Sequence, residues 1–168
     1  MRKTIRIGVL ILFTYFASSA SLQAQTKFLA TSSCGIATVH QTAAISDAGE
    51  HSISLDQREC RFEKPLELAG VSFSSYVATG VDDVQFEMSG DRGYAVGQAG
   101  NGDKYFLRYE GRAMMKGGVP SHLAGRWRFT GGTGKLRGLH GEGTYSAEPT
   151  SSGGMIFTLK GRYKLSIV

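Results

Sequence analysis

The sequence predicts an all-β protein: an antiparallel, closed barrel of about eight strands, preceded by a helical signal peptide. Short runs of residues alternate between apolar and polar side chains, which is the pattern of strands with one buried face. The 23 glycines far outnumber the three prolines and gather between those runs, where they suit tight turns. No window of comparable length carries an equally convincing amphipathic helical pattern.

The N-terminus has the order of a secretory signal peptide. Basic residues within the first six positions precede an apolar run over 7–17, and small residues follow it up to Ala24. This run of about 11 residues is shorter than the roughly 20 that a membrane-spanning helix needs, so we expect no permanent membrane anchor. We expect cleavage after Ala24, with Ala20 as the alternative site.

Cleavage there divides the chain into three parts. We expect a signal peptide over 1–24, a short N-terminal tail over 25–33 and a single barrel domain over 34–168, in a protein that is periplasmic or secreted. Removing the first part takes away three basic residues and leaves 16 against 14 acidic ones, so the net charge falls from +5 to +2. We therefore expect no nucleic-acid partner, because such partners usually need a clustered basic face.

The nearest approach to a basic patch comprises Arg126, Arg128, Lys135 and Arg137. The first two alternate with Trp127 and Phe129, as residues on the wet side of a strand do. This pattern favours a solvated face, with a polyanion site as the alternative.

Cys34 and Cys60 are the two cysteines of the chain. Thiols pair readily in an oxidising compartment, so we predict a structural disulfide, which stabilises a fold by roughly 3 kcal/mol. The cysteines and the four histidines lack the short spacings of metal ligands, and we expect no metal. The glycine-rich run over 131–136 fails the phosphate-loop and dinucleotide-binding patterns, and we expect no cofactor.

Two segments in the first half leave alternatives open. From His51 to Cys60 the apolar phase begins with Ile53 and Leu55, and Glu59 shares that phase. Glu59 is therefore a candidate to point inward near one barrel mouth, although the pattern favours a solvated strand end. The stretch from Pro65 to Ser75 fits either a strand or a short turn of helix.

Further strands are predicted along the rest of the chain. Over 81–88, Val84, Phe86 and Met88 alternate with polar residues, and the neighbouring carboxylates Asp82 and Asp83 are expected at a strand edge facing water. Later strands place one apolar phase inward, which comprises Tyr105, Leu107, Tyr109, Trp127, Phe129, Phe157 and Leu159. Turn signals separate the strands at 47–49, 90–93, 100–103, 116–118, 131–134 and 152–154. A closed barrel or a flattened sandwich both satisfy this pattern.

The run from Trp127 to Tyr145 carries a resemblance to a known family. Its residues W-R-F-T-G-G-T-G-K-L-R-G-L-H-G-E-G-T-Y resemble a stretch of exported bacterial proteins of unknown function that look like the allene oxide cyclase barrel family. Gly161-Arg162-Tyr163 and Tyr109-Glu110-Gly111 are similar to two further strands of that group. The resemblance spans roughly 35–168 and implies an eight-stranded barrel related in shape to calycins and dirigent proteins. It implies no catalytic residues by position.

We therefore expect a non-enzymatic barrel whose interior is either packed solid or binds a small apolar ligand. The candidate cavity residues are Tyr105, Tyr109, Trp127, Phe129 and Glu59. A cyclase-like or isomerase-like enzyme acting on an apolar substrate is the first alternative, and an envelope interaction module is the second. No catalytic residue and no oligomeric state can be assigned from the sequence.

Overall fold

Almost all of the described chain forms strands along which buried and exposed residues alternate. The computed structural model describes residues 25–47 and 49–166. On β6, for example, Tyr105 and Leu107 are buried while Arg108 and Glu110 are exposed. The strands are β1 (Thr26–Cys34), β2 (Val39–Ala44), β3 (His51–Leu68), β4 (Val71–Gln85), β5 (Met88–Gln98), β6 (Lys104–Lys116), β7 (Val119–Gly132), β8 (Leu139–Pro149) and β9 (Met155–Leu165). A single 3-10 turn, η1 (Gly134–Leu136), appears in the described residues.

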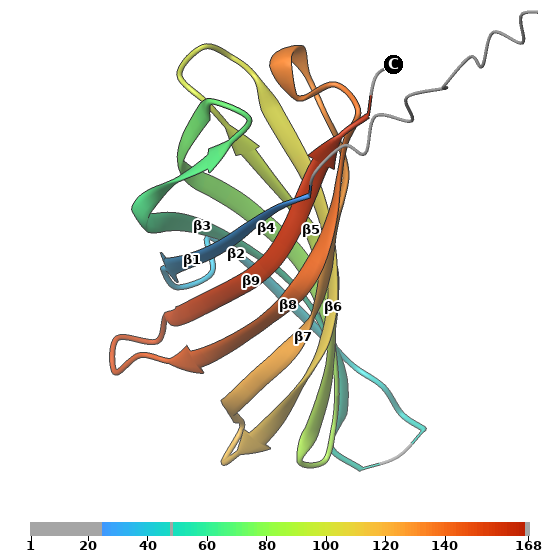
Figure 1. Cartoon of the computed structure of the whole chain (residues 1–168). Helices are drawn as coiled ribbons and strands as arrows, with labels where there is room; N and C mark the ends of the chain where they lie inside the picture. The colour runs from blue at the N-terminus through green and yellow to red at the C-terminus, as the bar shows by residue number, and fades with distance from the viewer. Residues whose placement is uncertain (1–24, 48, 167–168) are drawn as a thin grey trace, which may run out of the picture.

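The strands close into a barrel (Figure 1). Each strand from β3 to β9 pairs antiparallel with its sequence neighbour, and β9 pairs with β1 along the whole of β1. Closure is completed by a short seam in which Ser32, Ser33 and Cys34 of β1 pair with β3. Eight strands therefore form the barrel, and β2 extends the free edge of β3 beyond the seam. The predicted closed barrel is confirmed, and the sandwich alternative is wrong.

The seam also holds the predicted disulfide. Cys34 and Cys60 lie directly opposite each other on β1 and β3, and their sulfur atoms are bonded. Because the seam is only three residue pairs long, the covalent bond fastens the barrel where its hydrogen bonding is shortest. A disulfide also fits an oxidising compartment outside the cytosol.

Residues expected to be a tail are part of the barrel. The segment 26–33 lies within β1 and pairs with β9, so the expectation of a tail over 25–33 was wrong for these positions. The weak alternation of this segment conceals the strand, because Ser32 is buried on its inner face where an apolar residue would be expected. The helical signal peptide expected over 1–24 lies outside the described residues. Within the described ranges, no helix is long and apolar enough to cross a membrane.

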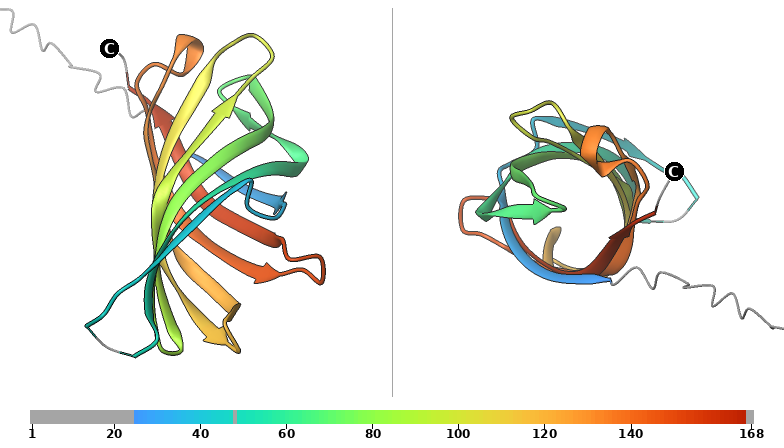
Figure 2. Two further views of the ribbon diagram at one scale, coloured as in Figure 1. Left: turned by 180° about the vertical axis from the view of Figure 1, so that it is seen from behind. Right: turned by 45° about the horizontal axis from the view of Figure 1, so that its top comes forward.

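The stretch from Pro65 to Ser75 forms a hairpin that covers one end of the barrel. β3 continues to Leu68, and β4 begins at Val71 after a turn in which Ala69 and Gly70 both have positive φ. This hairpin folds over the barrel opening in the right view of Figure 2. Its Leu68 and Phe73 are fully buried, as are Leu136 of η1 and Leu139 of β8. We call these four residues the packed end of the barrel.

The opposite end contains a turn that the sequence misplaces. Residues 90–93, predicted as a turn, lie inside β5, and the β4–β5 turn falls at Phe86 and Glu87. Gly90 and Gly93 suggest a turn in the sequence, but Gly93 lies in a strand, where the absence of a side chain leaves room for the ring of Tyr109. As a consequence, Asp91 belongs to a strand and faces the barrel interior.

Candidate functional site

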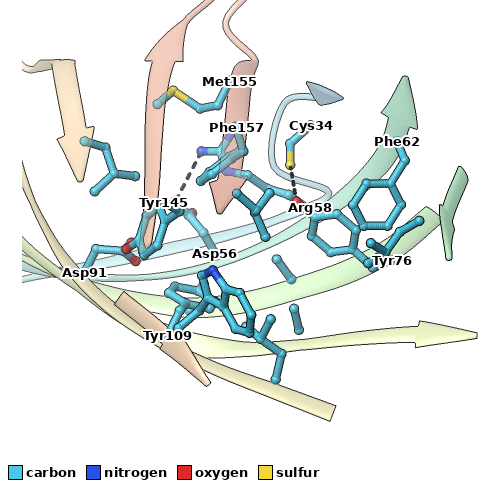
Figure 3. Close-up of a pocket in the computed structure, with 18 of the residues that line it drawn as sticks. Cys34, Asp56, Arg58, Phe62, Tyr76, Asp91, Tyr109, Tyr145, Met155 and Phe157 are labelled. Atoms are coloured by element: carbon cyan, nitrogen blue, oxygen red, sulfur yellow. Dashed lines mark hydrogen bonds and ion pairs between the residues drawn. The ribbon is translucent and has the colours of Figure 1, made fainter. Parts of the chain in front are cut away.

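The barrel encloses a cavity of about 130 Å³ (Figure 3). Its wall is mainly apolar and aromatic, and every barrel strand contributes to it. The apolar lining residues are Phe28, Phe62, Leu66, Ala78, Ala95, Leu107, Pro120, Leu123, Trp127, Phe129, Met155, Phe157 and Leu159. The barrel is therefore hollow beneath the packed end.

Four of the five predicted cavity residues line this space: Tyr105, Tyr109, Trp127 and Phe129. The Phe129 ring lies edge-on to both Tyr105 and Trp127, with centroid distances of 5.6 and 5.0 Å. Trp127 donates its indole N–H to the carbonyl oxygen of Thr144 at 3.1 Å, so that group is already satisfied. These rings are core and cavity wall at once, and their role in binding a ligand stays a prediction.

Glu59, the fifth predicted residue, points the other way. It is exposed and pairs across the sheet with the outward-facing Val77, so its choice as a cavity candidate was wrong, and it occupies the solvated position that the sequence favours. Side chains alternate along a strand, and Cys60 is fully buried on the inner face, where it is bonded to Cys34. Asp56 and Arg58 therefore face the interior in place of Glu59. Setting the phase of β3 from Cys60, and not from Ile53 and Leu55, would have found them.

A pair of carboxyl groups lies at the far end of the cavity from the packed end. Asp82 of β4 and Asp91 of β5 are directly opposite each other on the inner face of the sheet, and both line the cavity. We call this region the acidic end. Asp82 was expected to face water beside Asp83, but strand alternation turns only Asp83 outward, where it lies 2.9 Å from Nε2 of His51.

Burial perturbs both carboxyls. Loss of hydration, followed by the nearby charge of Asp91, raises the pKa of Asp82 from 3.8 to about 7. Loss of hydration also raises the pKa of Asp91 to about 6, although the Tyr145 hydroxyl donates a 2.8 Å hydrogen bond to it and lowers the pKa in part. Near neutral pH, Asp82 can therefore hold or release a proton.

Polar side chains from β2 and β3 flank the carboxyl pair. Arg58 lies 3.4 Å from Asp56 and donates a 3.2 Å hydrogen bond to the carbonyl of Gly35. Nδ1 of His40, from the extra strand β2, lies 2.5 Å from the same aspartate. The positive charge of Arg58 opposes part of the rise in the pKa of both Asp82 and Asp91.

Two tyrosines reach the acidic end because glycines on the neighbouring strands make room for their rings. A Cβ at Gly80 or Gly93 would lie within 2.6 Å of the Tyr109 hydroxyl. A Cβ at Gly111 would likewise collide with the hydroxyl of Tyr145, which crosses that strand to reach Asp91. Burial raises the pKa of Tyr109 and of Tyr145, so both hydroxyls stay protonated and can donate hydrogen bonds.

Two polar groups at this end have no partner in the described part of the chain. Neither the carboxyl of Asp82 nor the hydroxyl of Tyr109 makes a hydrogen bond or an ion pair there, and both line the cavity. The arrangement supplies a proton-exchanging carboxyl and a hydroxyl donor to whatever occupies the space. Among residues 25–47 and 49–166, no group of three or more His, Cys, Asp or Glu side chains is placed to hold a metal ion.

Fold and cavity together define a small closed β-barrel with an aromatic interior and an acidic end. No protein-family model matches the chain, and no curated protein matches it. Among solved structures it is similar to the pterocarpan synthase dirigent protein GePTS1, with a TM-score of 0.50 and 14% sequence identity. The alignment covers 94% of this chain and 98% of that one. At this identity the similarity establishes a dirigent-like barrel fold.

Proposed function

We propose that the barrel binds a small, largely apolar molecule that carries one oxygen-containing polar group. The proposal is carried by the unpartnered Asp82 carboxyl and Tyr109 hydroxyl at the end of the apolar cavity. Polar groups inside proteins are normally hydrogen-bonded, and ligand sites combine apolar walls with a few converging polar groups. A ligand hydroxyl or carbonyl would give both groups their missing partner.

The cavity volume limits the size of this ligand. Sites for drug-sized molecules span about 300–1,000 Å³, whereas an engineered cavity of about 150 Å³ accepts benzene. The 130 Å³ observed here suits a molecule of about one six-membered ring. Larger molecules would bind only if part of them protruded from the barrel.

Phenol and toluene form a matched pair of probes, because they differ in size by little and in hydrogen bonding by one hydroxyl. We expect phenol to bind more tightly than toluene in titration calorimetry. Tyr109→Phe should reduce this difference in affinity between phenol and toluene. Ala78→Leu, which fills the cavity, should abolish binding of both, whereas Val77→Leu on the exposed face of the same strand should not. Equal phenol binding by the parent protein and Ala78→Leu would refute the proposal.

The raised pKa of Asp82 favours a second candidate, an isomerase-like enzyme acting on an apolar substrate. A carboxyl with a pKa near the working pH is well suited to move a proton to or from carbon. Cyclohexanone provides a probe of one ring, and exchange of its α-hydrogens with deuterated water can be followed by NMR. Asp82→Asn should slow protein-catalysed exchange at least about tenfold while leaving cyclohexanone bound. Exchange no faster than in buffer would leave binding alone as the function.

We also propose that the protein is exported and acts in the periplasm or outside the cell. The sequence of residues 1–24 and the Cys34–Cys60 bond both support this location. Expression of the full chain in a bacterial host should yield a periplasmic or secreted protein. Its measured mass should equal that of a chain that begins at Gln25. A cytosolic protein of full-length mass would contradict the proposal.

A further inference from the structure

The outer face of the barrel contains a second recess, separate from the internal cavity. It lies over β1 and β6–β9, which run side by side in Figure 1, and has a volume of about 700 Å³. Six cationic side chains line it: Lys27, Arg108, Arg126, Arg128, Lys160 and Arg162. Of the four basic residues that the sequence groups together, Arg126 and Arg128 belong here, whereas Lys135 and Arg137 do not line the recess.

The cations are poorly neutralised by the protein itself. Glu110 and Glu142 are the two carboxylates that line the recess, so its net charge is +4. Among the described residues, one of the six cations has an acidic partner within 4 Å, namely Arg162, which lies 2.9 Å from Glu142. Since residues 25–168 carry a net charge of only +2, the rest of that chain carries −2. The positive charge is therefore concentrated on this face.

Cross-strand register makes the repulsion stronger. Arg108 faces Arg128 across the β6–β7 pair, and Lys27 faces Arg162 across the β1–β9 pair. Glu142 on β8 lies opposite both Arg128 and Arg162, so Arg108 and Lys27 are the members of these pairs with no carboxylate opposite them. Like charges directly opposite each other destabilise a sheet, and an acidic residue at either place would relieve the repulsion. A ligand with several anionic groups could neutralise both pairs, which lie on either side of β8.

The shape and chemistry of the recess select among anions. Gly143 and Gly161 face inward against the Trp127 ring, so their backbone forms part of the floor of the recess. The long cationic side chains form its rim, and a hollowed surface of this kind does not match a flat bilayer. The aromatic residues beneath it, Tyr109 and Trp127, turn their rings into the barrel. The exposed ring of Tyr94 lies opposite Arg108 beside the recess, but a single ring does not form the series of platforms on which successive nucleic-acid bases stack. Arginine forks pair well with carboxylates and sulfates, and Thr144 offers a hydroxyl between them.

We propose that this recess binds an acidic oligosaccharide, whose carboxylate or sulfate groups pair with the arginines. The site lies on the opposite side of the barrel wall from the cavity and does not depend on the ligand proposed for the interior. Opposed cations on neighbouring strands suit an anionic group lying between the strands, and exposed charges of this kind bind in a salt-dependent manner.

Titration of the disulfide-bonded protein with a heparin hexasaccharide tests the proposal. We expect saturable binding that weakens as salt rises, and no binding of a neutral dextran oligosaccharide. Arg126→Ser combined with Arg128→Ser should weaken binding about tenfold. Arg61→Ser combined with Lys64→Ser removes the same charge from exposed positions of β3 outside the recess and should change binding less than twofold.

Four outcomes would overturn the proposal. The first is equal weakening by the two double variants at matched thermal midpoints, which would mean that only total charge matters. The second is tighter binding of a single-stranded oligonucleotide of equal charge, and the third is tighter binding of phosphatidylglycerol vesicles. Absence of hexasaccharide binding at low salt would also refute it.

Discussion

The two ends of the barrel interior differ in whether their polar side chains have hydrogen-bond partners. At the packed end, Leu68 and Phe73 are fully buried, and the Tyr163 hydroxyl accepts a 2.9 Å hydrogen bond from the N–H of Ala69. At the acidic end, Asp82 has no partner in the described residues, and the hydroxyl of Ser89 is buried without one. Apolar burial stabilises a fold, whereas unpartnered buried polar groups destabilise it. We therefore expect the packed end to stabilise the fold, and we propose the acidic end as the place where a ligand is recognised.

The largest effect is expected at the packed end. Phe73→Ala removes a fully buried ring that packs edge-on against Tyr105 at 4.9 Å, so it should lower the free energy of unfolding by about 3–5 kcal/mol. Urea denaturation measures this change. Tyr94→Ala removes an exposed ring on β5 and is the control, with an expected loss below about 1 kcal/mol. A loss at Phe73 no larger than the control would contradict the assignment.

The acidic end should make stability depend on pH in a particular direction. Because folding raises the pKa of Asp82 from 3.8 to about 7, the folded state binds its proton more tightly than the unfolded state. Stability from this group is thus full below about pH 4 and is lost as pH rises through 7. Allowing for partial contact with water, we expect a fall of about 2 kcal/mol between pH 5 and pH 8.

Asp82→Asn tests the source of that fall. The variant should lose at least half of the pH dependence and should be more stable than the parent protein at pH 8, in thermal melts recorded at each pH. Glu63→Gln, at an exposed position of β3, should leave the dependence unchanged. If stability instead rose between pH 5 and pH 8, the two carboxyls would not be buried in the way described.

The smallest effect concerns the hydrogen bond between Tyr145 and Asp91. Tyr145→Phe removes a donor to the carboxylate, so the pKa of Asp91 should rise above its present value of about 6. The free energy of unfolding should fall by about 1 kcal/mol. Carbon-detected NMR titration of the Asp91 carboxyl measures the pKa directly. Tyr94→Phe, an exposed ring on the same sheet, should leave that pKa where it is.

Much of the fold could be predicted because strand alternation is a local property. The inward phase of β6 and β7 is evident from Tyr105, Leu107, Trp127 and Phe129, and these residues do line the cavity. The prediction failed on β3, where apolar Ile53 and Leu55 lie outside while Asp56 and Arg58 lie inside. Hydrophobicity alone assigns the wrong face to a strand whose inner side contributes charged groups to a site.

By itself the sequence determined the all-β class, the alternation of most strands and the pairing of Cys34 with Cys60. Tertiary structure alone decided which strands are neighbours and in what register. That register sets Asp82 beside Asp91 inside the barrel and Arg108 beside Arg128 outside it. Periodicity depends on residues two apart in the chain, whereas pKa values and charge clustering depend on groups that only barrel closure brings together.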